Sequence, residues 1–224
     1  MTRGPPPSTT ALGNIDPLRP PVLRLTRPTA QAVSAFLEAQ RTATFSYADV
    51  GASQSGTAPP GYTVDRNRIQ LGRGEETFRR AVAALRAWKM SSLGWSSIHP
   101  DAAPIVPGET VAIVAQHYGF WSLNACRIVY VIDQDVGGVR SVGFAYGTLP
   151  EHGVIGEERY MVEWNETDDS VWYDLYAFSR PAHPLARLGY PFARRLQRRF
   201  ARVSMRTMLD LAAPSAGTQL TSER

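Results

Sequence analysis

The stretch that decides the fold is PLARLGYPFARRLQRRFARVSMRTMLD, residues 184–210. Its large side chains recur at helical spacing and fall within about 60° of one another on a helical wheel. They are Phe192, Leu196, Phe200 and Val203, followed by Thr207. The pattern predicts a long helix from about Pro184 to Asp210 whose apolar side is buried. Because Pro191 breaks or bends a first turn, Leu185–Tyr190 is a candidate for a separate turn.

Arginines occupy an adjoining arc of about 140° on the same helix. They are Arg194, Arg195, Arg198, Arg199, Arg202 and Arg206. Two interpretations stay open for them. In the first, they form the solvated side of a helix whose other side is core. In the second, Arg194, Arg195, Arg198, Arg199 and Arg202 contact a polyphosphate or an anionic membrane surface, where each contributes on the order of 1 kcal/mol.

A nucleic-acid partner is disfavoured by the rest of the sequence. The formal net charge is +4, and Lys89 is the only lysine among 24 basic residues. This bias toward arginine is typical of GC-rich codon usage, so the arginine count alone is weak evidence for anion binding. No zinc finger, RNP-like aromatic motif or helix-turn-helix accompanies the charge.

The composition is that of one globular domain. The chain has 224 residues, of which 43% are hydrophobic and 20% charged. Cys126 is the only cysteine, which excludes an internal disulfide and favours a reducing, cytoplasmic location. No window has the roughly 18 apolar residues that a membrane helix needs. We expect a disordered leader over 1–25, one domain over 26–212 and a disordered tail over 213–224.

Two helices and a strand are predicted in the first half of the chain. PTAQAVSAFLEAQ, residues 28–40, is a short helix that Thr29 caps. YTVDRNRIQLG, residues 62–72, is a strand. GEETFRRAVAALRAWKM, residues 74–90, is a helix with four large apolar side chains on one side. These four are Phe78, Val82, Leu85 and Trp88.

From residue 110 the apolar pattern changes to the period of two that is typical of strands. Five such runs cover 110–118, 122–133, 140–149, 157–164 and 170–179. The returns between them are short, which predicts antiparallel hairpins. The predicted fold is therefore α+β, with an antiparallel sheet of about six strands and a long C-terminal helix.

Several of these segments resemble one family. They are GYTVDRNRIQLGRGEETF, WSLNACRIVYVID, GFAYGTLPEHGVIGEERYMVEW, SVWYDLYAFSRPAHPLARLGYP and ARRLQRRFA. Together they resemble the bacterial and plant family domain of unknown function nineteen-ninety. The resemblance implies a relationship to the START-like helix-grip superfamily, in which a curved sheet wraps the C-terminal helix and leaves a cavity. Many members of that superfamily bind hydrophobic small molecules, and some catalyse reactions on them.

Polar residues inside apolar strands are the first candidates for a site. Asn124 and Arg127 interrupt one strand, and Asp174 alternates with Trp172 and Tyr176 in another. If this aromatic side faces the cavity, Asp174 is a carboxylate on an apolar wall and needs a partner, for which Arg127 is one candidate. The alternative is that Asp174 caps a loop or faces water.

The loop GTLPEHGVIGEE, residues 147–158, adds a second set of candidates. His152 with Glu158 or another carboxylate has the chemistry of an acid–base pair, although a titrating surface histidine has the same sequence pattern. Tyr146 and the other strand aromatics serve equally as cavity wall or as plain core. The four histidines lack metal-ligand spacing, so neither a metal nor a cofactor is predicted.

The leading functional hypothesis is a protein that binds an apolar or amphipathic small molecule. The residues predicted to line its site are Asn124, Arg127, Tyr146, His152, Glu158, Trp172, Asp174 and Tyr176. One alternative is an enzyme on the same scaffold that uses Asp174, His152 or Glu158 as acid–base groups. The other is an adaptor that docks on anionic membranes through the arginine arc.

Overall fold

The computed structural model describes residues 22–182 and 189–214. The elements in chain order are β1 (Val22–Arg24), α1 (Ala30–Gln40), the 3-10 helix η1 (Ala52–Ser55), β2 (Thr63–Arg73), α2 (Glu75–Arg86), β3 (Ser96–His99), β4 (Thr110–His117), β5 (Phe120–Val136), β6 (Val139–Thr148), β7 (Val154–Asn165), β8 (Ser170–Pro181) and α3 (Tyr190–Ala212).

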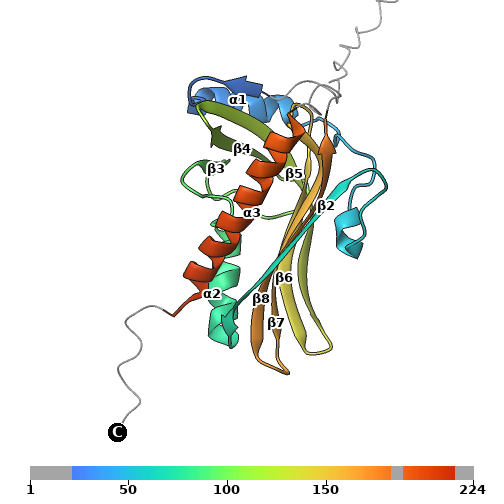
Figure 1. The fold of residues 1–224 in the computed structure, drawn as a ribbon, viewed down its shortest axis with the longest axis vertical. Helices are drawn as coiled ribbons and strands as arrows, with labels where there is room; N and C mark the ends of the chain where they lie inside the picture. The colour runs from blue at the N-terminus through green and yellow to red at the C-terminus, as the bar shows by residue number, and fades with distance from the viewer. Residues whose placement is uncertain (1–21, 183–188, 215–224) are drawn as a thin grey trace, which may run out of the picture.

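The strands form one curved antiparallel sheet in the order β2-β8-β7-β6-β5-β4-β3, and β1 pairs with β5. The α+β class and the C-terminal helix are confirmed (Figure 1). The sheet has eight strands, where about six were expected. β1 and β3 account for the difference, since no apolar run of strand length marks either. Val22–Arg24 lies at the end of the segment expected to be disordered.

The two longer helices lie on the concave side of the sheet. α2 and α3 run beside each other at the end of the molecule where the C-terminus emerges (Figure 1). α1 packs at the opposite end, where Val33 joins a small cluster with Val114 of β4 and Leu123 of β5. Thr29 caps α1 by accepting a hydrogen bond from the Ala32 amide, as the sequence predicts.

α2 fills only one end of the concave face. Its Phe78, Val82 and Leu85 are buried in the main core, together with Trp88 just beyond its end. A helix of 12 residues is about 18 Å long, whereas the 12 residues of β8 span about 40 Å. α2 therefore does not reach the other end of the concave face and leaves that end uncovered.

On β8 and β2, the inward side chains differ between the end that α2 covers and the end that it leaves uncovered. On β8 the inward residues Val171, Tyr173 and Leu175 belong to the core, and Ala177 then borders open space. On β2 the inward residues change from Ile69 at the core end to Asp65 and Asn67 at the open end. The sheet is thus apolar where α2 covers it and more polar beyond.

The buried side of α3 differs from the prediction. Phe192, which was expected to point inward, is 49% exposed, while Leu196, Phe200, Val203 and Thr207 are partly buried. The fully buried positions are Ala201, Ser204, Met208 and Ala212. Small side chains suffice near the sheet, where Ser204 Oγ shares a 3.0 Å hydrogen bond with Tyr173 Oη. The first half of α3 covers open space instead of a packed core.

α3 begins at Tyr190, with Pro191 in its first turn. The expected start at Pro184 lies outside the described residues. So does most of the predicted turn over Leu185–Tyr190. Proline is well tolerated in a first turn, because its missing N–H would have no partner within the helix there.

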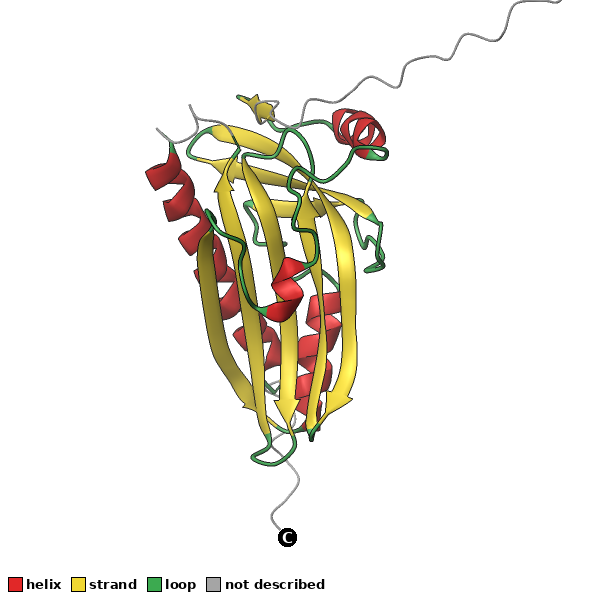
Figure 2. Cartoon of the chain, turned by 90° about the vertical axis from the view of Figure 1, so that its right-hand side faces the viewer, coloured by secondary structure: helices red, strands yellow, loops and turns green. Residues whose placement is uncertain are grey.

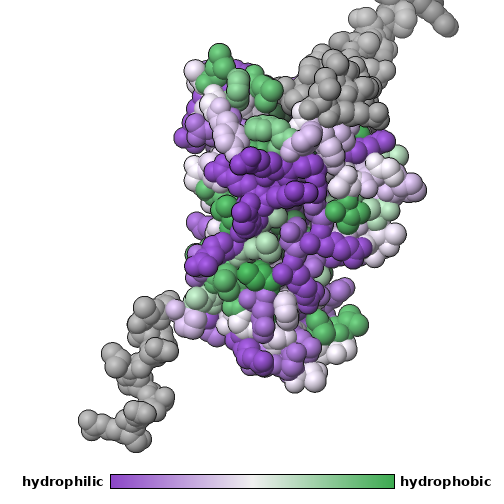
Figure 3. Space-filling view, viewed as in Figure 1, coloured by the Kyte–Doolittle hydropathy of each residue, from purple (hydrophilic) through white to green (hydrophobic). Residues whose placement is uncertain are grey.

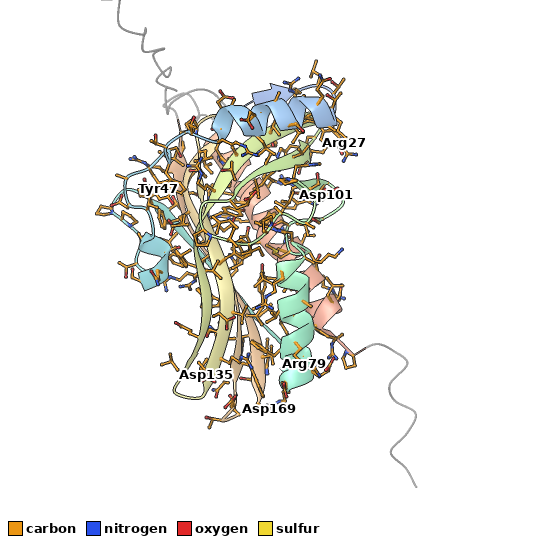
Figure 4. All side chains as sticks on the ribbon, turned by 180° about the vertical axis from the view of Figure 1, so that it is seen from behind. Arg27, Tyr47, Arg79, Asp101, Asp135 and Asp169 are labelled. Carbon is orange, nitrogen blue, oxygen red and sulfur yellow. The ribbon has the colours of Figure 1, made fainter. Side chains whose placement is uncertain are left out.

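The convex side of the sheet is covered by residues 45–58, which include η1 and which we call the strap (Figure 2). Glu157 of β7 holds the strap by accepting hydrogen bonds from Tyr47 Oη at 2.5 Å, Gly51 N at 2.7 Å and Ser53 N at 2.9 Å. Ser53 Oγ donates a further, short bond to the same carboxylate. Figure 4 shows Tyr47 on the segment that leads from α1 to η1. The sheet therefore buries apolar residues on both faces.

Within 22–182 and 189–214, no helix combines the length and the hydrophobicity needed to cross a membrane.

Candidate functional site

A cavity of about 510 Å³ lies between the open end of the concave face and the first half of α3. Strands β2 and β4–β8 contribute its walls, and α3 forms one side. Most of the α3 residues that border it are small or apolar, and they are joined by one amide and one arginine: Phe192, Ala193, Leu196, Gln197, Arg198, Phe200 and Ala201. The cavity exists because α2 stops short of this end and α3 presents alanines where larger side chains would fill the space.

The rim of the cavity carries exposed apolar side chains. Leu23 of β1 is 61% exposed and Phe120 of β5 is 50% exposed. Phe192 of α3 completes this set, and its ring lies 5.5 Å from the ring of Tyr118. Exposed large apolar residues that gather at one place commonly mark a contact surface.

Glu158 of β7 lies on the cavity wall in a cluster with two tyrosines. Tyr146 Oη donates a 2.8 Å hydrogen bond to Glu158 Oε2 and shares another of 2.8 Å with Tyr160 Oη. Tyr146 and Glu158 are directly opposite each other on β6 and β7, so the strand pairing fixes their distance. Burial raises the pKa of Glu158, and the hydrogen bonds from the tyrosines oppose that effect.

A second polar chain crosses β4 and β5. Asn124 Nδ2 donates to Ser122 Oγ at 2.9 Å, and Ser122 Oγ shares a 3.0 Å hydrogen bond with His117 Nε2. Burial lowers the pKa of His117, and the nearby guanidinium of Arg199 lowers it further. The neutral imidazole of His117 can therefore accept a hydrogen bond from the Ser122 hydroxyl through Nε2. The Glu158 cluster and this chain are thus two separate polar groups on the cavity walls.

His152 borders the cavity from the β6–β7 connection. Its Nδ1 accepts a 3.2 Å hydrogen bond from the Val154 amide, which places the remaining proton on Nε2. Burial lowers the pKa of His152 to about 4, so the imidazole is neutral at physiological pH.

Arg194 of α3 and Asp65 of β2 form a bidentate ion pair at the edge of the cavity. The same guanidinium also donates to Gln197 Oε1, and Gln197 Nε2 donates to Ser179 Oγ of β8 at 3.0 Å. Tyr190 Oη adds a 2.6 Å bond to Thr63 of β2. These contacts tie the first half of α3 to the sheet on one side of the cavity.

Half of the predicted site residues border the cavity. They are Asn124, Tyr146, His152 and Glu158. Their role in ligand binding stays a prediction. Tyr146 is buried and also borders the cavity. It therefore belongs both to the hydrophobic core and to the cavity wall, which the sequence left as two alternatives.

The predicted pair of Arg127 with Asp174 is wrong. Arg127 donates to the backbone oxygens of Gln40, Arg41 and Ala43, and so caps the C-terminal end of α1. A cation at this end of a helix is favourable because the last carbonyl groups have no partner within the helix.

Trp172, Asp174 and Tyr176 lie on the convex face of β8, which corrects their assignment to the cavity. Asp174 accepts a 2.9 Å hydrogen bond from Arg159 and lies 3.9 Å from Arg68. Tyr176 packs under the strap. The assignment failed because β8 is apolar on both faces, so its alternation does not reveal which face is concave. Asp174 therefore lies on the opposite face of the sheet from Glu158, and the alternative of acid–base groups at the cavity stays a prediction for His152 and Glu158 alone.

The arginine arc of α3 is only partly free. Arg194 is held by Asp65, and Arg199 stacks on Trp95 with 4.7 Å between the guanidinium carbon and the ring centroid. Arg195, Arg198 and Arg202 are exposed. Figure 3 shows the resulting hydrophilic band across the face on which α3 lies.

Sequence reasoning missed Asp65, His117, Ser122 and Gln197 as cavity residues. A signal was present for two of them. Asp65 alternates with Asn67, and Ser122 alternates with Asn124, so each pair shares one face of its strand. Nothing comparable marks His117 or Gln197, since their placement depends on β4 and α3 meeting across the cavity. Among residues 22–182 and 189–214, no three His, Cys, Asp or Glu side chains are grouped as metal ligands.

A curved antiparallel sheet that wraps a C-terminal helix over a cavity is a helix-grip architecture. The particular family follows from the sequence. The model of the family described as Domain of unknown function (DUF1990) matches residues 46–207, and the chain belongs to this family.

Two relatives are similar over most of their length. A UPF0548 protein of Dictyostelium discoideum is 35% identical over 200 residues, which cover 82% of this chain and 92% of the relative. A UPF0548 protein of Deinococcus radiodurans is 36% identical over 195 residues, covering 83% and 96% respectively. Among solved structures, a hypothetical protein of Helicobacter pylori has a TM-score of 0.47 at 11% identity, covering 70% of this chain and 95% of that chain.

Proposed function

We propose that this protein binds an apolar or amphipathic small molecule in the cavity between the sheet and α3. The observation that carries the proposal is a volume of about 510 Å³ bordered mainly by apolar side chains with a few polar groups. Small-molecule sites have volumes of roughly 300–1,000 Å³ and this composition.

The energetics favour a ligand with a substantial apolar part. Leu175, Leu196 and Phe200 present apolar surface to the cavity. Each methylene group that a ligand buries there contributes about 0.8 kcal/mol. Water gains little from such walls, because an ordered water needs two to four polar partners.

Native mass spectrometry of the purified protein tests the proposal directly. We expect a bound small molecule, or uptake of the neutral dye Nile red with increased fluorescence. Ala193→Trp fills the cavity from α3 and should abolish both signals. Arg202→Trp places the same side chain at an exposed position of the same helix and should leave them unchanged. If neither a retained molecule nor dye uptake is observed with the wild type, the proposal is wrong.

A second candidate function is peripheral binding to an anionic membrane. It is favoured by the exposed rim residues Leu23, Phe120 and Phe192, which adjoin the exposed Arg198 at the cavity. Apolar side chains that enter the interface, flanked by arginines, are the usual composition of a membrane-contacting surface. The two candidates are compatible, since a rim in contact with lipid would let an apolar ligand enter the cavity without crossing water.

A further inference from the structure

Three acidic residues contribute atoms to the cavity wall, but the carboxylate of one of them, Glu157, faces the strap on the convex side of the sheet. Asp65 is held by Arg194 through both of its oxygens. Glu157 accepts four hydrogen bonds from the strap. Glu158 differs, because its Oε2 accepts a 2.8 Å hydrogen bond from Tyr146 and the only other described group that hydrogen-bonds its carboxyl group is the Tyr160 hydroxyl. Within the part of the chain that the structure describes, neither a cation nor a backbone amide bonds its Oε1.

Among the described residues, no cation is one of the groups that act on the Glu158 carboxyl group. The titratable groups that act on it from the neighbouring strands are all acidic: Asp65 on β2, Cys126 on β5, Tyr146 on β6, Tyr160 on β7 and Tyr173 on β8. Arg194 of α3 is bound to Asp65. A partly buried carboxylate without a counter-charge is costly, which agrees with the raised pKa of Glu158.

We propose that the ligand supplies the missing partner: a largely apolar molecule whose hydroxyl or amine group donates a hydrogen bond to Oε1 of Glu158. This inference rests on the proposed function and specifies its ligand class. The apolar part of the ligand would lie against Leu196 and Phe200 of α3. A hydroxyl and an amine share the chemistry that the site requires, which is an N–H or O–H donor.

The same geometry excludes a ligand with a carboxylate group at this position. A second anion would lie next to Glu158, and among the described residues no cation is paired with Glu158 to offset the repulsion, since Arg198 borders the cavity from the exposed side of α3. Leaving a buried polar group without its hydrogen bond costs about 1–3 kcal/mol, which corresponds to roughly tenfold or more in affinity. Free fatty acids should therefore bind worse than alcohols or amines of equal length.

Displacement of Nile red by decanol, decylamine and decanoate tests the inference. These probes share one chain and differ in the head group. At about pH 8, well above the ordinary pKa of a carboxyl group, we expect decanol or decylamine to bind at least about tenfold more tightly than decanoate. An advantage confined to decylamine identifies a charged donor, and a comparable advantage for decanol identifies a neutral one.

The variant Glu158→Gln removes the charge and keeps the size of the side chain. It should reduce the advantage of decylamine over decanoate by about tenfold or more. Glu163→Gln makes the same chemical change on the convex face of the same strand, away from the cavity, and should leave the ratio unchanged. If Glu158→Gln does not fold, the order of affinities of decanol, decylamine and decanoate for the wild type tests the role of Glu158.

Failure of the inference is distinct from failure of the proposed function. If Nile red does not bind, the small-molecule function itself is wrong. If Nile red binds and decanoate equals or exceeds the other two probes, the cavity binds ligands but the role given to Glu158 is overturned. If the affinity ratio of decylamine to decanoate is unchanged in Glu158→Gln, the role given to Glu158 is likewise overturned.

Discussion

The guanidinium of Arg194 on α3 binds both carboxylate oxygens of Asp65 on β2, which precedes it by 129 residues in the chain. Their side chains are only 15% and 22% exposed. This ion pair is a bidentate contact between the edge strand β2 and the helix that covers the cavity. It also explains why an arginine lies on the inward side of an amphipathic helix.

Arg194→Met should lower the free energy of unfolding by about 2 kcal/mol, because it leaves Asp65 partly buried without a counter-charge. Urea unfolding measures this change, and a double-mutant cycle with Asp65→Asn isolates the coupling between the two residues. Arg206→Gln is the matched control, since the side chains of Arg206 and Asp210 are 73% and 59% exposed and their pair should contribute less than about 0.5 kcal/mol. Equal effects of Arg194→Met and Arg206→Gln would contradict the structural role of Arg194.

The strap depends on Glu157. Glu157→Gln replaces an acceptor of four hydrogen bonds with an amide that clashes as a donor with the strap amides. We expect a loss of about 2–3 kcal/mol of stability and faster hydrogen exchange over residues 51–56. Gly147→Ala should produce the same exchange pattern, because a methyl group there overlaps the Tyr47 hydroxyl.

The control for the strap is Glu163→Gln on the same strand and face, where the partner Arg68 is half exposed. It should change stability by less than Glu157→Gln and leave exchange in the strap unaltered. A strap that exchanges at its original rate in the Glu157 variant would show that apolar packing alone holds it.

His152 should make stability depend on pH on the acid side. Its pKa falls from 6.5 to about 4 on folding because of burial, so the unfolded state binds a proton that the folded state does not. The stabilisation is complete above about pH 6.5 and is lost as the pH falls toward 4. Between pH 7 and 5 the wild type should lose about 2 kcal/mol more than His152→Gln. His117 titrates in the same direction in both proteins and cancels in the comparison. Parallel pH profiles would exclude the burial of a neutral His152.

Membrane binding should depend on the exposed arginines of α3. We expect the wild type to sediment with vesicles that contain phosphatidylserine, and to be released as salt screens the attraction beyond about 10 Å at 0.1 M. Replacing Arg195, Arg198 and Arg202 with glutamine should weaken binding by about 1 kcal/mol per residue.

The control for the vesicle experiment carries the same charge change on other faces, at the exposed Arg66, Arg73 and Arg86. It should retain most of the binding. Equal losses in the two triple variants would indicate attraction by net charge, and binding that persists in high salt would point to the apolar rim instead.

The sequence by itself determined the order of the elements. The period of two in residues 110–179 and the helical spacing of Phe78, Val82 and Leu85 are local patterns, and local backbone geometry converts each into a strand or a helix. Short returns between the runs were enough to predict antiparallel pairing.

Only the tertiary structure decided which face of each element meets the cavity. Alternation shows that a strand has two different faces, but this sheet buries apolar side chains on both, under α2 and α3 on one side and under the strap on the other. Asp174 and Glu158 therefore had the same local pattern, and only the curvature of the sheet placed one outside and the other at the cavity. The inward turn of Arg194 likewise depends on Asp65, a contact between segments far apart in the chain that no local periodicity encodes.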